Sequence, residues 1–169
     1  MKCICFSDSH GSSYYMNKVL SMHPDTEVVF FLGDGLSDLE CIASAHREIC
    51  FLPVRGNCDT SATFKDNFVK KTECITLAGK RIAYTHGDLY GAKYGTGGLL
   101  KLADELNADI VLFGHTHLPH ESYAETEMGR NVYLFNPGSI SMGGFNSDAS
   151  FGVIMLEENG VLLSHGYVR

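Results

Sequence analysis

The sequence has no apolar run long enough to cross a bilayer. Its longest runs, such as residues 28–32 and 110–113, fall far short of the roughly 20 residues that a membrane-spanning helix needs. It also has no low-complexity tract and no internal repeat. These absences disfavour membrane-spanning and repeat proteins. Because the chain has 169 residues and is 44% hydrophobic, we expect a single globular domain over residues 1–169.

Basic residues are few. The 13 Lys and Arg residues stand against 20 Asp and Glu residues, which gives a formal net charge of −7. A protein that holds nucleic acid through its phosphates relies on clustered Lys and Arg, so we expect no nucleic-acid partner, whether sequence-specific or not. A small phosphorylated substrate would need cations that the site itself supplies. Bound metal ions would provide them.

The six cysteines form no Cys-x-x-Cys pair, which argues against a thiolate zinc site. The start of the chain reaches Asp8 too early to contain a secretory signal of the usual length, so we expect a cytoplasmic protein with reduced thiols. Cys3, Cys5, Cys50 and Cys74 lie in apolar, strand-like runs, and we expect them to be buried.

Short apolar runs alternate with amphipathic segments. In the first third, residues 2–7, 27–32 and 49–54 predict strands and residues 12–22 and 36–46 predict helices, which together make a βαβαβ unit. Further on, the pattern predicts a hairpin at 68–77 and 81–85, a helix at 98–106, and strands at 109–113, 131–135, 151–156 and 161–168. We therefore expect an α/β fold in which a two-sheet β sandwich is flanked by helices.

Polar motifs follow five of the predicted strands directly. They are Asp8-Ser9-His10, Gly33-Asp34, Gly56-Asn57-Cys58-Asp59, His86-Gly87-Asp88 and Gly114-His115-Thr116-His117. In open α/β sheets the crevice beyond the carboxyl ends of the strands is where ligands bind, so we expect the motifs to converge. The glycines that flank them allow the backbone to turn sharply and to approach a ligand closely.

The residue types of these motifs share one chemical meaning. Carboxylate, imidazole and amide oxygen together suit Mn²⁺, Fe²⁺, Co²⁺ or Zn²⁺, and the thiolates of a closed structural zinc site are missing. In Asp8-Ser9-His10 and His115-Thr116-His117, alternate side chains of an extended segment would point to one side. We therefore expect one metal-facing edge per motif. Each motif alone is a weak signal, and the prediction of a metal site rests on all five.

The order Asp-x-His, Gly-Asp, Gly-Asn-x-Asp, His-Gly and Gly-His-x-His resembles the calcineurin-like metallophosphoesterases, which have a four-layer αββα fold. The later segment Asn136-Pro137-Gly138-Ser139 resembles the small YfcE-like branch, so the resemblance covers nearly the whole chain. It implies a phosphodiesterase in which a hydroxide shared by two divalent ions attacks phosphorus. The ions would be Mn²⁺, with Fe²⁺, Zn²⁺, Co²⁺ and Ni²⁺ as alternatives, and the protein would form a homodimer or homotetramer.

The resemblance also implies a set of ligands. One ion would be held by Asp8, His10, Asp34 and His117, and the other by Asp34, Asn57, His86 and His115. Asp34 would bridge the two ions, since one carboxylate can bind both. The residues that take part in catalysis would be Asp34, Asn57, Cys58 and His86. The sequence contains no Gly-x-Ser-x-Gly elbow and no P-loop that would indicate a nucleophilic serine or an NTPase.

Cys58 departs from the pattern of the wider superfamily, where a His at this position can protonate the leaving oxygen. A thiol is a weak donor, and a thiolate formed beside two cations donates no hydrogen bond at all. We therefore expect a preference for substrates with good leaving groups. The alternatives are that Cys58 packs in a tight loop or binds a metal itself.

Four further residues have two interpretations each. Asp59 would orient its own loop or a neighbouring ligand, and Asp88 would support a ligand or face solvent. Arg55 would contact a substrate phosphate or form a structural salt bridge. His120 would stand at the rim of the site or pack elsewhere.

The motifs leave three alternatives to a phosphodiesterase. A phosphomonoesterase or a nucleotide pyrophosphatase would use the same site. A scaffold similar to the retromer subunit of this fold would bind partner proteins instead. Specificity would come from the loops at residues 90–97 and 142–148, whose shapes the sequence does not give.

Overall fold

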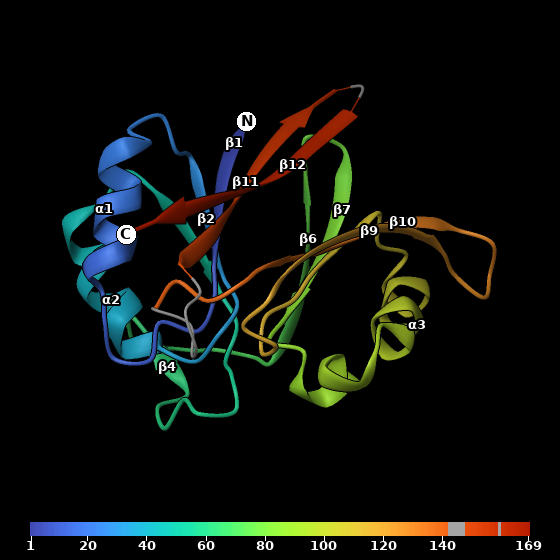
Figure 1. Ribbon diagram of the computed structural model, residues 1–169, viewed down its shortest axis with the longest axis horizontal. Helices are drawn as coiled ribbons and strands as arrows, with labels where there is room; N and C mark the ends of the chain where they lie inside the picture. The colour runs from blue at the N-terminus through green and yellow to red at the C-terminus, as the bar shows by residue number, and fades with distance from the viewer. Residues whose placement is uncertain (142–147, 159) are drawn as a thin grey trace.

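The computed structural model describes residues 1–141, 148–158 and 160–169. Two five-stranded sheets pack face to face, and helices cover their outer faces (Figure 1). The helices α1 (Tyr14–Met22) and α2 (Leu36–Ala45) lie on the first sheet, and α3 (Gly97–Leu106) lies on the second. This αββα arrangement confirms the predicted fold class.

The first sheet contains the predicted βαβαβ unit. Its strand order is β12 (Gly160–Val168), β11 (Ala149–Glu157), β1 (Lys2–Phe6), β2 (Val28–Phe31) and β3 (Cys50–Pro53). The strands β1, β2 and β3 are parallel, and β11 pairs antiparallel with both β1 and β12. The carboxyl ends of the three parallel strands therefore lie at one edge.

The second sheet contains the predicted hairpin. Its strand order is β6 (Thr72–Leu77), β7 (Lys80–Thr85), β8 (Ile110–Leu112), β10 (Asn131–Pro137) and β9 (Pro119–Glu125). The strands β7, β8 and β10 are parallel. Between β6 and β7, Ala78 and Gly79 both have positive φ, of 46° and 74°, as a tight two-residue hairpin turn requires.

Alternation along the strands builds the core on both faces of each sheet. In β1, Ile4 and Phe6 pack toward α1 and α2, whereas Cys3 and Cys5 pack between the two sheets. In β10, Val132 and Leu134 pack toward α3. Because both faces are buried, these strands appear as unbroken apolar runs in the sequence.

The sequence missed several elements and misplaced one residue. Phe68 belongs to the short strand β5 (Asn67–Phe68), which pairs with β4 (Thr63–Phe64) and not with the hairpin. Two short 3-10 helices, Asp88–Tyr90 and Ala92–Tyr94, precede α3. The strand β9 was not predicted, because its residues are polar and every second one is exposed.

The prediction that Cys50 is buried is wrong. Cys50 is exposed, because it begins β3, which is an edge strand of its sheet. Cys3 and Cys5 are buried as expected, and Cys74, on the edge strand β6, is half-buried. Among the described residues, no helix combines the length and the apolar character that crossing a bilayer requires.

Candidate metal centre

Five strands of the two sheets end at one place. Asp8 follows β1, Asp34 follows β2 and Asn57 follows β3 in the first sheet. His86 follows β7 and His115 follows β8 in the second sheet. The structure brings all seven predicted ligands together across the interface between the sheets.

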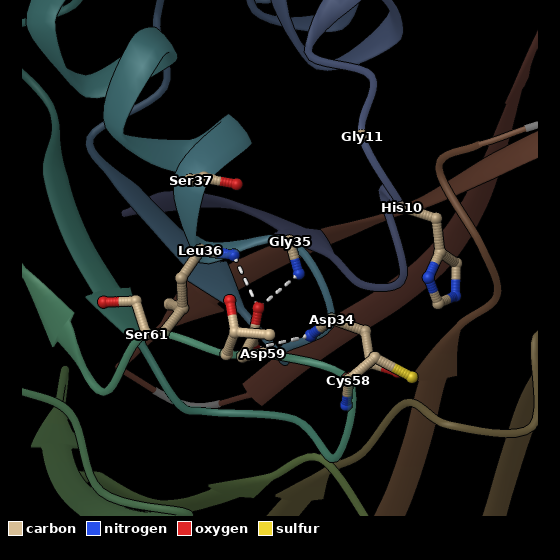
Figure 2. A pocket seen from close by; sticks show the side chains of 10 residues that line it. His10, Gly11, Asp34, Gly35, Leu36, Ser37, Cys58, Asp59 and Ser61 are labelled. Atoms are coloured by element: carbon tan, nitrogen blue, oxygen red, sulfur yellow. Dashed lines mark hydrogen bonds between the residues drawn. The ribbon is translucent and has the colours of Figure 1, made fainter.

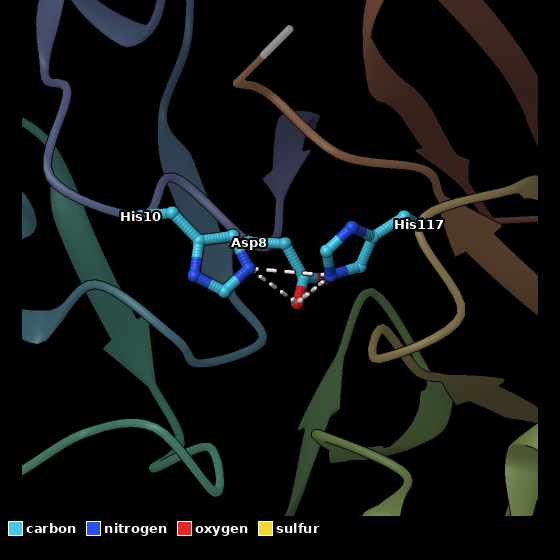
Figure 3. Close-up of side chains that lie close together, drawn as sticks. All are labelled: Asp8, His10 and His117. Carbon is cyan, nitrogen blue, oxygen red and sulfur yellow. Dashed lines mark hydrogen bonds and ion pairs between the residues drawn. The ribbon is translucent and has the colours of Figure 1, made fainter. Parts of the chain in front are cut away.

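One group of contacts surrounds Asp8 (Figure 3). The Nε2 atoms of His10 and His117 lie 3.2 Å apart, and both rings face the Asp8 carboxylate. His117 Nε2 is 3.2 Å from Asp8 Oδ1, and His10 Nε2 is 3.7 Å from the same atom. The side chains come from the ends of β1 and β8, in different sheets. This group offers one carboxylate and two imidazoles to a metal ion.

A second group surrounds His86. His86 Nε2 lies 3.0 Å from Asn57 Oδ1, 3.1 Å from His115 Nδ1 and 3.4 Å from Asp34 Oδ2. His86 is fully buried, and its Nδ1 lies 2.7 Å from the carbonyl oxygen of Leu32. Since a carbonyl can only accept, Nδ1 carries the proton and Nε2 of the neutral ring keeps a free lone pair for a ligand bond.

Asp34 lies between the two groups. The possible metal-binding atoms of Asp8, Asp34 and His86 all lie within 4.8 Å of one another. The same is true of those of His10, Asp34 and Cys58. Asp34 Oδ1 accepts a hydrogen bond of 2.7 Å from the backbone N–H of Cys58. This central position is the one that a bridging carboxylate would need.

The backbone at the ligands is strained and not extended. Asp8, His10, Asp34, His115 and His117 all have positive φ, between 45° and 67°. Non-glycine residues rarely adopt this conformation, and it costs of order 1–3 kcal/mol at each position. Such strain is concentrated at functional sites, where the surrounding structure enforces it.

The prediction of one metal-facing edge per motif is wrong for His115 and His117, whereas Asp8 and His10 do face one group of contacts. It assumed extended segments, whereas both motifs turn through the left-handed region. In the second motif the two imidazoles separate: His115 faces His86, and His117 faces Asp8. One motif thus contributes to both groups of contacts.

Two glycines allow the loops after β2 and β3 to touch. A Cβ atom at Gly56 would collide with the backbone nitrogen and the carboxylate of Asp34. A Cβ atom at Gly33 would collide with the backbone of Gly56, and Gly33 also has a φ of 95°. These two glycines thus allow a close approach between the two loops, and their predicted role in the approach to a bound ligand stays a prediction.

The two oxygens of the Asp8 carboxylate differ in their hydrogen bonds. Asp8 Oδ2 accepts hydrogen bonds from Ser7 Oγ at 2.5 Å and from the His115 backbone N–H at 3.1 Å. Within the described residues, Asp8 Oδ1 is buried and accepts no hydrogen bond. A buried carboxylate oxygen without a donor is costly, and a bound cation would remove the cost. The donor set of oxygen and imidazole nitrogen thus fits divalent metal ions.

Asp59 organises the loop that carries Asp34. Its Oδ2 accepts hydrogen bonds from the backbone N–H groups of Asp34, at 2.9 Å, and Gly56, at 2.8 Å. Its Oδ1 accepts from Gly35, at 2.7 Å, and Leu36, at 2.9 Å, at the start of α2 (Figure 2). Of the two predicted roles, that of orienting its own loop is confirmed, and Asp59 also holds the backbone of Asp34, a predicted ligand.

Burial and neighbouring charges set the protonation of the site. Burial favours a higher pKa for Asp34, but the neighbouring His86 and the hydrogen bond from the Cys58 backbone N–H outweigh it and hold the pKa well below its usual range. Burial favours a lower pKa for His86, yet Asp34 and Asp8 raise it. Asp8 raises the pKa of His117, and burial lowers that of His115. Asp34 is thus kept as the anion that a cation requires.

Cys58 lies beside the cluster and is exposed. Its Sγ lies 3.2 Å from Asn57 Nδ2, and the Asp34 carboxylate raises its pKa. In the absence of bound cations the thiol is therefore favoured over the thiolate.

Among the described residues, three other candidates form no side-chain hydrogen bond or ion pair with the predicted ligands. Arg55 donates its backbone N–H to Lys70, and the described residues show no hydrogen bond or ion pair between its side chain and a predicted ligand. His120, on β9, lies 2.9 Å from Ser122 Oγ and packs on Phe113. Asp88 forms an ion pair with Lys71 at 2.9 Å.

Two supporting residues were missed from the sequence. Ser7 donates to the Asp8 carboxylate, and Ser139 donates to the Asp8 backbone carbonyl at 2.8 Å. Ser7 directly precedes a ligand, which was an available signal. No local signal connects Ser139 to Asp8, because 131 positions separate them.

The chain resembles known proteins over most of its length. The sequence model of the calcineurin-like phosphoesterase superfamily domain matches residues 1–159. "Probable metallophosphoesterase YsnB" of Bacillus subtilis is 31% identical over 159 residues, which cover 94% of this chain and 86% of that protein. "Phosphodiesterase YfcE" of Escherichia coli is 27% identical over 172 residues, covering 91% and 87%. The solved structure of Vacuolar Protein Sorting 29 from Cryptosporidium parvum has a TM-score of 0.78 at 20% identity, covering 99% and 91%.

Proposed function

Because the chain belongs to the calcineurin-like phosphoesterase superfamily, we propose that it is a phosphodiesterase that depends on two divalent metal ions. The observation that carries the proposal is that seven side chains with oxygen or nitrogen donors meet in two adjoining groups of contacts, one of which contains the buried Asp8 Oδ1. The name of the YfcE relative supports the choice of a diester as substrate.

The two groups of contacts supply the two ligand sets. Asp8, His10 and His117 would hold one ion, with Asp34 as fourth ligand. Asn57, His86 and His115 would hold the other, again with Asp34, which its central position supports. Mn²⁺ is the proposed ion, because carboxylate, amide oxygen and imidazole all suit it.

The residues of the chain prepare the site for the reaction. Ser7 and the His115 N–H fix the direction of the Asp8 carboxylate. The Leu32 carbonyl fixes the tautomer of His86, and Asp59 holds the loop of Asp34. When bound, the cations would supply the positive charge that neutralises the phosphoryl oxygens and lowers the pKa of the attacking water. Because the ligands are already placed, little reorganisation is needed.

Cys58 would determine which leaving groups the enzyme tolerates. It lies next to Asn57 and within 4.8 Å of ligand atoms of His10 and Asp34, so it stands near the reacting phosphoryl group. A thiol is a weak proton donor, so the enzyme would favour esters whose leaving group needs no protonation.

A scaffold is the second candidate, supported by the likeness in fold to Vacuolar Protein Sorting 29. The complete ligand set favours catalysis, since a surface that only binds proteins has no need of five strained residues around a buried carboxylate. A partner-binding surface elsewhere on the same protein is compatible with an active site.

The test is a panel of phosphoesters assayed with Mn²⁺, Co²⁺, Zn²⁺, Ni²⁺ and Fe²⁺. We expect bis(p-nitrophenyl) phosphate to be hydrolysed faster than p-nitrophenyl phosphate and than a nucleoside diphosphate ester. The variant Asp34→Asn should lose activity, whereas Asp25→Asn, which alters an exposed ion pair with Lys2, should keep it. A protein that retains no metal and hydrolyses no ester in excess Mn²⁺ would support the scaffold instead.

A further inference from the structure

A pocket extends from the metal centre toward the start of α2. It has a volume of about 250 Å³ and opens beside three residues of the centre, His10, Asp34 and Cys58 (Figure 2). Away from the centre it runs between the first turn of α2 and the loop after β3, where Ser37 and Ser61 line it. A group attached to a phosphate at the centre would therefore extend into this pocket.

The wall of the pocket mixes apolar surface with several hydroxyl groups. Ser37, Thr60 and Ser61 contribute hydroxyl groups, and all three residues are exposed. The one large aliphatic residue in the lining, Leu36, is 1% exposed, so it offers almost no surface to a ligand. A ligand group that carries hydroxyls can form hydrogen bonds with these side chains, which an aromatic or alkyl group cannot do.

The charges in the lining are acidic. It includes the carboxylates of Asp34 and Asp59, and none of the described residues that line it is Lys or Arg. The Asp59 carboxylate accepts four backbone hydrogen bonds, so it is fixed in place as an anion. Bound metal ions would offset the charge of Asp34, so Asp59 is the carboxylate that a second phosphate or a carboxylate in the ligand would face, with no Lys or Arg in the described lining.

We infer that this pocket is a subsite for an uncharged, hydroxyl-rich ester group, such as glycerol or a single sugar, carried by the phosphate at the metal centre. The inference rests on the proposed function and narrows its substrate class to polyol phosphodiesters. Ser37 is the specificity-determining residue, because it lines the pocket from α2 and takes no part in the metal centre.

The test compares three phosphomonoesters as ligands of the Mn²⁺-loaded protein by calorimetry: methyl phosphate, glycerol 1-phosphate and 2-carboxyethyl phosphate. All place the same phosphate at the centre and differ in the group that enters the pocket. We expect glycerol 1-phosphate to bind about three- to tenfold more tightly than methyl phosphate, as one or two hydrogen bonds allow. The carboxyethyl ester should bind more weakly than either.

Variants of Ser37 locate the effect. Ser37→Leu would fill the pocket, so the ratio of the affinities for the glycerol and methyl esters should fall to about one. Ser37→Lys should make the carboxyethyl ester bind more tightly than the methyl ester. The matched control is Ser44→Leu, two turns further along α2, where the hydroxyl bonds only to Glu40 of its own helix. It should leave all three affinities unchanged.

The outcomes separate the inference from the proposed function. Equal binding of the glycerol and methyl esters in the wild type, or an equal effect of Ser37→Leu on both, would overturn the inference. Hydrolysis of bis(p-nitrophenyl) phosphate, measured on the same preparation, tests the proposed function. If the preference holds but no ester is hydrolysed, the subsite stands and the catalytic proposal fails.

Discussion

The Nε2 atoms of His10 and His117 lie 3.2 Å apart, although 107 positions separate the two residues. Both face a buried oxygen of Asp8 that accepts no hydrogen bond within the described residues. Two imidazole nitrogens and a carboxylate oxygen lie close together here. A bound cation could accept a lone pair from each of the three. This contact links the loop after β1 in the first sheet to the loop after β8 in the second sheet.

Metal binding should stabilise the fold. At a free Mn²⁺ concentration 100 times the dissociation constant, a single site adds about 2.7 kcal/mol, which corresponds to about 5–10 °C in Tm for a chain of this size. Differential scanning fluorimetry with and without a chelator measures the shift. The shift should shrink in Asp8→Asn and persist in Asp25→Asn. An identical Tm with and without Mn²⁺ would contradict a metal centre at these residues.

Asp59→Ala should loosen the loop that carries Asp34. The change leaves four backbone N–H groups without their charged acceptor, so we expect the free energy of unfolding to fall by about 2–3 kcal/mol. Affinity for Mn²⁺ should fall about 10- to 100-fold, as for other residues that orient a ligand. Urea unfolding and metal titration measure the two effects. Asp25→Ala serves as control, and unchanged metal affinity in Asp59→Ala would show that the loop holds without this carboxylate.

Gly56→Ala should damage the centre through a single methyl group. Its Cβ would collide with Asp34, so we expect a loss of at least about 2 kcal/mol of stability, or a displaced Asp34 with weak metal binding. Gly97→Ala is the matched control, because a Cβ there meets no atom within 4 Å at the start of α3. Equal stability and equal metal content in the two variants would refute the close approach of the loops.

Cys58→His should extend the range of leaving groups. An imidazole can protonate a departing alkoxide, and general-acid catalysis of this kind is typically worth about 10²–10⁴ in rate. We therefore expect turnover of alkyl esters to rise more than that of aryl esters, measured as the ratio of kcat/KM for the two classes. Cys41→His, at an exposed position on α2, should leave the ratio unchanged. Equal or reduced rates on both classes would count against a role for residue 58 in leaving-group protonation.

Much of the architecture followed from local pattern. Apolar runs such as 28–32 predicted strands buried on both faces, and the polar residues directly after them predicted where ligands would gather. The strand β9 escaped prediction because its partner β10, and not its own polar sequence, makes it a strand. Cys50 was placed in the core because an apolar run does not reveal that its strand lies at the edge of a sheet.

By itself, the sequence determined which candidate ligand residues the chain offers, their order and their position at strand ends, because these depend on residue type and on short-range periodicity. Only the tertiary structure decided how His115 and His117 divide between two groups of contacts, that Asp59 binds four N–H groups, and that Ser37 lines a pocket. These features depend on contacts between distant segments and on left-handed backbone at the ligands, which the packed fold enforces against local preference.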